Sequence, residues 1–185
     1  MHEKTAELII DDSERESDLL WASGFLAVDQ FTWLRDSRGS AIMLTDLELG
    51  RGEKESRVDE VISLSAVEKS AREVKGGEPC SFEEIVLQLL KSRNIERVEV
   101  PSRFPLMIAD FLRSGGIEVV ARENPFFSDR RIKRADEIRC LEESQAATEE
   151  AMALALFEKE TALLARTAAE AEREAEAMAE AAEEE

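Results

Sequence analysis

Residues 81–120 read SFEEIVLQLLKSRNIERVEVPSRFPLMIADFLRSGGIEVV, and this stretch decides the fold. Ser81 and Glu84 match a capping box, and the apolar residues that follow recur at helical spacing. Short β-branched runs come later, at 97–100 and 117–120. Strands that alternate with helices indicate parallel strands with helices packed on the sheet.

A second helix is predicted between those two runs. Ser102 is its expected N-cap, Pro105 lies in its expected first turn, and Gly115 and Gly116 end it. The apolar residues between these limits share one face of a helix. The stretch therefore holds two helices and two strands of a layered α/β domain.

Four further strands are predicted before this stretch, at 6–10, 30–34, 40–45 and 58–64. A turn at 37–39 joins the second and third of them into a hairpin. A hairpin pairs its strands antiparallel, so the sheet is mixed. The predicted fold class is α/β, with a mixed sheet flanked by helices and followed by a long C-terminal helix.

The long C-terminal helix is predicted from the absence of helix breakers. No Gly or Pro occurs between Asp136 and Glu185, and alanine, the best helix former, is frequent there. Leu163 and Leu164 are the last large aliphatic residues, and Met178 is the one bulky apolar residue after Arg166. We expect this helix to pack along its first part and to be solvated near its end.

The charge of the chain is strongly negative and unevenly spread. The formal net charge is −18, from 42 acidic and 24 basic residues in 185. Residues 142–185 alone hold 14 acidic and 3 basic residues, a net of −11. This sign argues against nucleic acid and against an anionic membrane surface as partners. No stretch approaches the roughly 20 apolar residues that span a bilayer.

No catalytic, cofactor-binding or metal-ligating residue is predicted. The single histidine is His2, too few for a His-containing metal site or a histidine base. Cys80 precedes a predicted helix, where a reactive thiolate is possible, but a structural thiol is the favoured interpretation. Two free cysteines, Cys80 and Cys140, and no visible secretory signal predict a cytoplasmic location.

Aromatic residues gather between Trp21 and Trp33. Core packing is the favoured interpretation of this cluster. The alternative is a loop that faces another subunit or an active site, since aromatics at glycine-containing turns anchor interfaces. The residues of that possible contact are Gly24, Phe25, Asp29, Phe31 and Trp33.

Several segments resemble one family when taken in order. Residues 131–138, RIKRADEI, are similar to the junction R-x-I-K-S-x-x-E-I of the creatinase/prolidase metallopeptidases, the Xaa-Pro aminopeptidases and dipeptidases. Residues 13–15 and 18–25, SER and DLLWASGF, resemble the family's S-x-x-x-D-x-x-Y-L-T-G-F stretch. Residues 41–46, AIMLTD, resemble its strand L-L-T-D.

The resemblance implies three segments. Residues 1–130 are expected to form the family's N-terminal α/β domain. Residues 131–157 correspond to the junction and the first helix of the catalytic domain, and 158–185 form an Ala/Glu-rich helical tail. The family binds two divalent metals, such as Mn or Co, on a catalytic domain that this sequence does not contain, so none of their ligands can be transferred to it. The chain is then a truncated or rebuilt fragment, or a natural protein without the catalytic half.

The resemblance implies a non-catalytic domain that serves assembly and active-site gating in a Xaa-Pro metallopeptidase-like protein. It also implies a homo-oligomer, a dimer or tetramer, and a peptide substrate only where a catalytic domain is supplied. A different interpretation follows from the tail. The chain would be a stand-alone interaction protein that binds a basic or helical partner through its long acidic helix.

Overall fold

The computed structural model describes the backbone of residues 4–183 and the side chains of residues 4–175. It divides into two compact units, Met1–Arg131 and Ile132–Glu185. The division between them falls one residue beyond the boundary expected after residue 130. The other expected boundary, after residue 157, falls inside a continuous helix.

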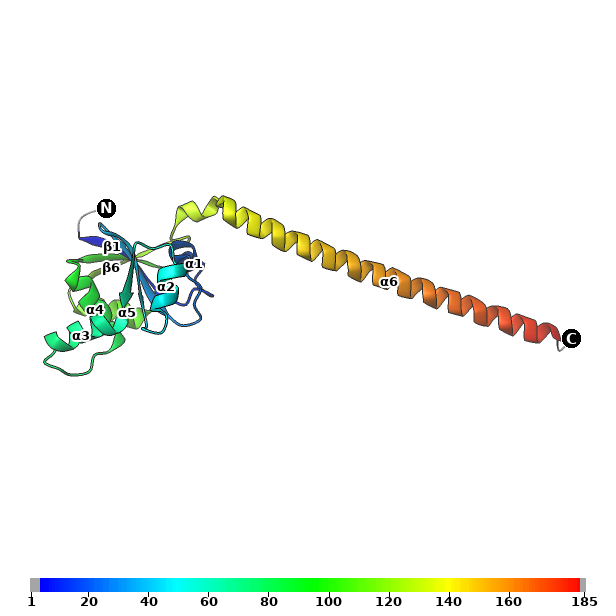
Figure 1. Ribbon diagram of the computed structural model, residues 1–185, viewed down its shortest axis with the longest axis horizontal. Helices are drawn as coiled ribbons and strands as arrows, with labels where there is room; N and C mark the ends of the chain where they lie inside the picture. Colours follow the sequence, from blue (N-terminus) through cyan, green and yellow to red (C-terminus); the bar gives the residue numbers. More distant parts are fainter. Residues whose placement is uncertain (1–3, 184–185) are drawn as a thin grey trace. The chain divides into compact units, whose positions relative to one another are not determined.

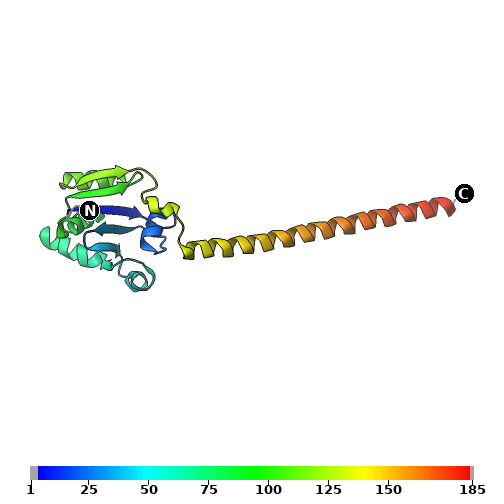
Figure 2. The ribbon, with the colours of Figure 1, turned by 90° about the horizontal axis from the view of Figure 1, so that it is seen from above.

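The first unit is built on one mixed six-stranded sheet of order β4-β3-β2-β1-β5-β6, and Figure 2 shows β5 and β6 in green at one edge. β2 is antiparallel to both of its neighbours, and the other pairs are parallel. The predicted mixed α/β fold is therefore confirmed. The strands are β1 (Thr5–Asp11), β2 (Phe31–Asp36), β3 (Gly39–Leu44), β4 (Glu60–Ser63), β5 (Arg97–Pro101) and β6 (Glu118–Arg122).

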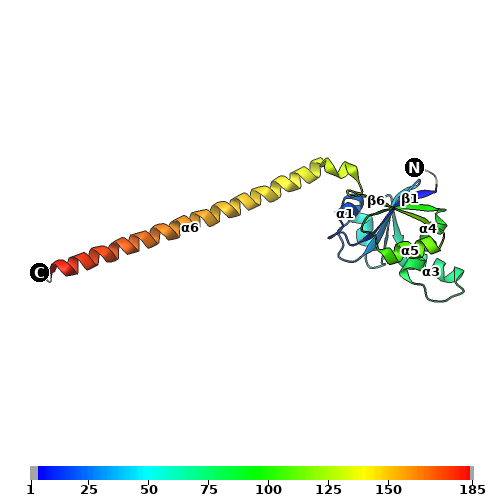
Figure 3. The ribbon, with the colours of Figure 1, turned by 180° about the vertical axis from the view of Figure 1, so that it is seen from behind.

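Helices cover both faces of this sheet. Figures 1 and 3 show α3, α4 and α5 grouped on one side, away from α1. The helices of this unit are α1 (Ser17–Ser23), α2 (Leu49–Glu55), α3 (Leu64–Val74), α4 (Phe82–Ser92) and α5 (Leu106–Ser114), with a short 3-10 turn η1 (Ser128–Arg131) at its end.

The strands alternate between two cores, as a side-chain period of two requires. In β1, Leu8 and Ile10 face the core under α4 and α5, while Ile9 faces the second core. In β2, Leu34 faces the first core and Trp33 the second. The second core also holds Leu19 of α1 and the pair Phe126 and Phe127 that follows β6.

The predicted start of α4 is confirmed. Ser81 is the N-cap, and its hydroxyl accepts a hydrogen bond from the Glu84 amide while Glu84 bonds back to the Ser81 amide. The predicted start of α5 is wrong, because the helix begins at Leu106 with Pro105 as N-cap. A residue before a proline avoids the helical region, so Phe104 cannot belong to a first turn that starts at Ser102.

The strand predicted at 58–64 is too long. β4 ends at Ser63, where the chain turns directly into α3. The Ser63 side chain accepts a hydrogen bond from the Ala66 amide and so caps α3. A capping serine inside an apolar run marks a helix start, and this signal competes with the β-branched residues before it.

The second unit consists mainly of α6 (Ala135–Glu183), 49 residues long, shown from yellow to red in Figure 1. The predicted long C-terminal helix is therefore confirmed. Among its described side chains, the large apolar ones from Ile138 to Leu164 are exposed. The predicted packing of its first part stays a prediction. None of the helices in the described residues has the length and apolar character needed to cross a membrane.

Candidate functional site

The loop that connects α1 to β2 is the candidate site, because the predicted contact residues lie in it or next to it. Gly24 ends α1 with a φ of +64°, and its amide donates a hydrogen bond to the Leu20 carbonyl. A Cβ atom at this position would lie 2.7 Å from Cγ of Arg57. Both the backbone conformation and the available space therefore favour glycine here.

The three aromatic residues of the predicted contact are buried within their own chain. Phe25 and Phe31 meet edge to face with ring centroids 5.7 Å apart, and Trp33 meets Phe127 in the same way at 5.4 Å. Arg35 lies over the rings of both Trp33 and Phe127. These three side chains pack in the second core, as the favoured interpretation expects. The predicted contact with another subunit stays a prediction.

The side chains that the loop does expose are Leu26, Val28, Asp29 and Gln30. Leu26 and Val28 retain 54% and 72% of their accessible surface. The intervening Ala27 is fixed, because its amide donates to the Ser13 hydroxyl at 2.7 Å and its carbonyl accepts from the Ser13 amide at 3.2 Å. The loop therefore offers two apolar side chains on a backbone held in place.

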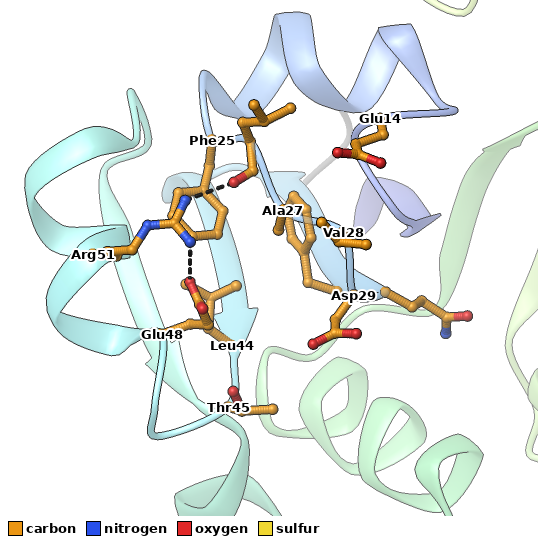
Figure 4. Close-up of a pocket in the computed structure, with 12 residues that line it drawn as sticks. Glu14, Phe25, Ala27, Val28, Asp29, Leu44, Thr45, Glu48 and Arg51 are labelled. Carbon is orange, nitrogen blue, oxygen red and sulfur yellow. Dashed lines mark hydrogen bonds and ion pairs between the residues drawn. The ribbon is translucent and has the colours of Figure 1, made fainter.

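A hollow of about 250 Å³ lies beside the loop, between it and the carboxyl end of β3 (Figure 4). Arg51 of α2 lies 4.7 Å from the centre of the Phe25 ring. Its guanidinium donates to the Leu26 carbonyl and to Glu48, both at 2.7 Å. A hydrogen bond with Glu55 raises the pKa of Arg51 further above its ordinary value. The arginine thus ties α2 to the loop.

The charge around the hollow is acidic. Glu14, Asp29 and Glu48 line it, while Arg51 is already engaged by Glu48 and Glu55. The exposed apolar pair lies at the same place. This combination suits a surface with apolar and basic groups better than a small anion.

Solved structures with the same fold are Xaa-Pro peptidases. An X-Pro aminopeptidase from Thermotoga maritima has a TM-score of 0.61 at 12% identity, covering 79% of this chain and 39% of that one. A Xaa-Pro dipeptidase from Bacillus anthracis has a TM-score of 0.60 at 13% identity, and the match covers 80% of this chain and 38% of the dipeptidase. A creatinase/prolidase N-terminal domain from Streptococcus pyogenes also matches, at a TM-score of 0.37 and 12% identity, covering 64% and 82%.

The chain shares its fold with the matched part of the aminopeptidase and the dipeptidase. The chain spans about two fifths of the length of the aminopeptidase and the dipeptidase. No family model matches the sequence. No curated protein matches it either. The predicted resemblance is therefore confirmed at the level of fold.

All strands except β2 run in the same direction, so their carboxyl ends lie together at one end of the sheet. Ligands of open α/β sheets commonly bind beside these carboxyl ends. Asp46 follows β3 there, and its carboxylate accepts hydrogen bonds from the hydroxyls of Ser63 and Ser65. These bonds, from Ser63 first, lower the pKa of Asp46. The cluster joins the ends of β3 and β4 to the start of α3.

Stability at this cluster is expected to depend on pH. The folded-state pKa of Asp46 lies below that of the unfolded chain, about 3.9. The stabilisation is therefore complete above this value and is lost as the pH falls through the folded-state pKa. Urea midpoints of wild type and Ser65→Ala should differ at pH 7 and converge in acid. A difference between the two midpoints that did not diminish in acid would contradict this assignment, and Asp46→Asn, which cannot titrate, is the control.

The residues described do not fit the two divalent metals that the family implies. Within the part of the chain with described side chains, no three His, Cys, Asp or Glu residues come together in a way that could hold a metal ion. His2 lies outside the described residues. Cys80 and Cys140 are both free thiols, half-buried and exposed respectively.

One anchoring residue escaped the sequence analysis. Asp18 of α1 is buried, and its carboxylate accepts hydrogen bonds from the Phe126 amide at 3.1 Å and from the Arg130 guanidinium at 2.8 Å. These bonds hold the segment that carries Phe126 and Phe127 in the second core. Arg130 and Asp18 are 112 residues apart in sequence, so no local pattern indicates that they pair.

Proposed function

We propose that the chain is the non-catalytic N-terminal domain of a Xaa-Pro metallopeptidase-like protein, serving in assembly and in gating an active site that another domain supplies. The observation that carries the proposal is the α1–β2 loop of this peptidase fold, whose Leu26 and Val28 are exposed beside an acidic hollow. Aliphatic side chains exposed on a braced loop cost little ordering entropy when a partner covers them. The chain acts through contacts, as a homo-oligomer, and meets a peptide substrate where a catalytic domain is present.

The assembly role predicts that the loop contributes to self-association. Leu26→Ser combined with Val28→Ser should weaken association in sedimentation experiments and leave the thermal midpoint almost unchanged, because both side chains are exposed. Val74→Ser, at a similarly exposed position on α3, is the matched control. Equal association of the loop variant and the wild type would count against this role for the loop.

The non-catalytic role predicts that the purified chain does not hydrolyse Xaa-Pro dipeptides when Mn²⁺ or Co²⁺ is added. The sequence has one histidine, His2. Among the described side chains, no three His, Cys, Asp or Glu residues come together in a way that could hold a metal ion. Product release can be followed by the appearance of free proline. Metal-stimulated hydrolysis that co-purifies with the chain would overturn this part of the proposal.

A second candidate function rests on α6. Large apolar side chains are exposed between Ile138 and Leu164. Four of them, Met152, Leu154, Leu156 and Phe157, lie close together and spread over more than half of the helix circumference. Acidic residues surround them. The chain would then bind a basic partner that encloses this part of the helix.

This candidate predicts salt-sensitive binding of a basic amphipathic helical peptide rich in Lys and Leu. Leu156→Ser with Phe157→Ser should abolish the binding, while Ala168→Ser with Ala169→Ser, farther along the same helix, should preserve it. Fluorescence anisotropy of the labelled peptide measures both. Unchanged binding by the first variant would remove the basis of this candidate.

A further inference from the structure

β6 forms one edge of the sheet. It pairs with β5 on one side, and among the strands of residues 4–183 none pairs with its other side (Figure 2). An open edge strand is a template for a further strand, and proteins usually protect it with charges or bulges. The five residues of β6 run in the ladder with β5 without a bulge.

The outward backbone groups of β6 can be assigned. The Glu118 amide donates to the Glu96 carbonyl at 2.8 Å, so residue 118 points into the sheet. Alternate residues of a strand point opposite ways, and Val119 and Ala121 therefore direct their N–H and C=O groups outward. The Arg113 guanidinium donates to the Val119 carbonyl at 3.3 Å, which agrees with this direction.

The side chains of β6 are complementary to a second copy of themselves. Glu118, Val120 and Arg122 share one face, with opposite charges two residues on either side of Val120. In an antiparallel pair centred on Val120, Glu118 of each copy lies opposite Arg122 of the other. Centring the pair on 118 or 122 would oppose like charges, and centring it on 119 or 121 would leave both charges without an opposite partner.

The existing ion pairs leave room for this contact. Glu118 is bonded to Arg97 at 2.7 Å, yet 59% of its side chain is accessible. Arg122 is bonded to Glu7 at 2.7 Å and to Glu99 at 3.2 Å. Positive Arg97 of β5 and negative Glu118 of β6 already lie side by side across neighbouring strands. Arg122 of a second copy, placed next to Glu118, would continue this alternation of charge.

The neighbouring side of α5 extends the surface. Leu106, Asp110 and Arg113 lie on one side of this helix, at spacings of four and three residues, and Arg113 reaches β6. Leu106 is 69% exposed, although it is aliphatic. A carbonyl oxygen has two lone pairs, so the Arg113 bond does not prevent Val119 from accepting a ladder hydrogen bond.

We propose that β6 and the adjoining side of α5 form a symmetric interface with a second copy of this chain, in which two β6 strands pair antiparallel about Val120. The inference rests on the proposed assembly role and names a surface for it, separate from the α1–β2 loop. Residue 119 of each copy exchanges backbone hydrogen bonds with residue 121 of the other copy. The two copies of residue 120 face each other as a close pair without hydrogen bonds.

Disulfide trapping tests this register. Close antiparallel pairs without hydrogen bonds have Cα atoms about 4.5 Å apart, within the range of a disulfide. Val120→Cys in the full chain, with Cys80→Ser and Cys140→Ser, should therefore form a covalent dimer under mild oxidation. Glu118→Cys in the same background is the matched control, because its two copies would lie four strand positions apart, about 13 Å. The double variant Glu118→Cys with Arg122→Cys should again form a covalent dimer, because residue 118 of each copy lies opposite residue 122 of the other.

Equal linking of the Val120 and Glu118 variants would overturn the proposed register. A second variant tests the edge itself: Ala121→Pro removes an outward N–H, and added to the Val120→Cys variant it should abolish the covalent dimer, with the folded state checked by tryptophan fluorescence. A folded Ala121→Pro variant that still forms the Val120 cross-link would overturn the interface, whereas association of this variant in sedimentation without the cross-link would leave the assembly role standing. A wild-type chain that is monomeric at all concentrations would overturn both.

Discussion

Replacing Arg93 by methionine is expected to lower the free energy of unfolding of the α/β unit by about 3–5 kcal/mol. Arg93 follows α4, its side chain is 5% exposed, and it donates to Asp36 at 3.2 Å and to Glu60. The Asp36 side chain is 1% exposed, so the substitution would leave a buried carboxylate without its counter-ion. Since small domains are stable by about 5–15 kcal/mol, urea unfolding at pH 7 should show a large fall in midpoint.

The matched control for this prediction is Arg72→Met. Arg72 pairs with Glu68 on the exposed side of α3, and surface changes of this kind stay within about 0.5 kcal/mol. Replacing Asp36 by leucine together with Arg93→Met should recover part of the loss, because no buried charge is then left unpaired. If Arg93→Met cost no more than Arg72→Met, the ion pair would not carry the stability assigned to it.

Replacing Trp33 by alanine is expected to cost about 3–5 kcal/mol of unfolding free energy, the range for a fully buried aromatic side chain. Trp33 lies in the second core beside Phe127 and is 1% exposed. The cavity would open between the sheet and the segment after β6. Fluorescence of the remaining Trp21, which packs against the same core, measures the loss during urea unfolding without depending on the deleted indole.

The oligomeric state distinguishes a core role of Trp33 from a role between subunits. Molecules of Trp33→Ala that remain folded should associate like wild type, because the side chain is covered within one chain. Trp33→Phe, which keeps a ring beside Phe127, should be much less destabilised. A variant that dissociated without any loss of stability would place Trp33 at an interface instead.

Local signals explain which parts of the fold could be predicted from the sequence. The capping box at Ser81 and Glu84 and the glycines after α5 are encoded within a few residues, and they located α4 and the end of α5. The short helices α1 and α2, of seven residues each, were not predicted. Helices of this length hold together mainly by tertiary packing, which no local pattern reveals.

The candidate site was predicted in position but not in detail. The sequence located the aromatic cluster around Gly24 and Trp33, and the alternation in β2 then turned its rings inward. Which residues of the loop stay exposed depends on Ser13 and Arg51, which brace it from distant segments. The partners of Asp18 and Arg93 lie 33 to 112 residues away, so their burial could not be anticipated from neighbours in sequence.

The presence of α6 in a unit of its own affects how unfolding would be observed. Both tryptophans, Trp21 and Trp33, belong to the first unit, so fluorescence records only the cooperative loss of its cores. The backbone bonds of α6 are local, and a helix held by local bonds frays gradually from its ends. Ellipticity at 222 nm should therefore decline before the fluorescence transition begins. Amide protons of α6 should exchange with deuterium well ahead of those in β1 and β5.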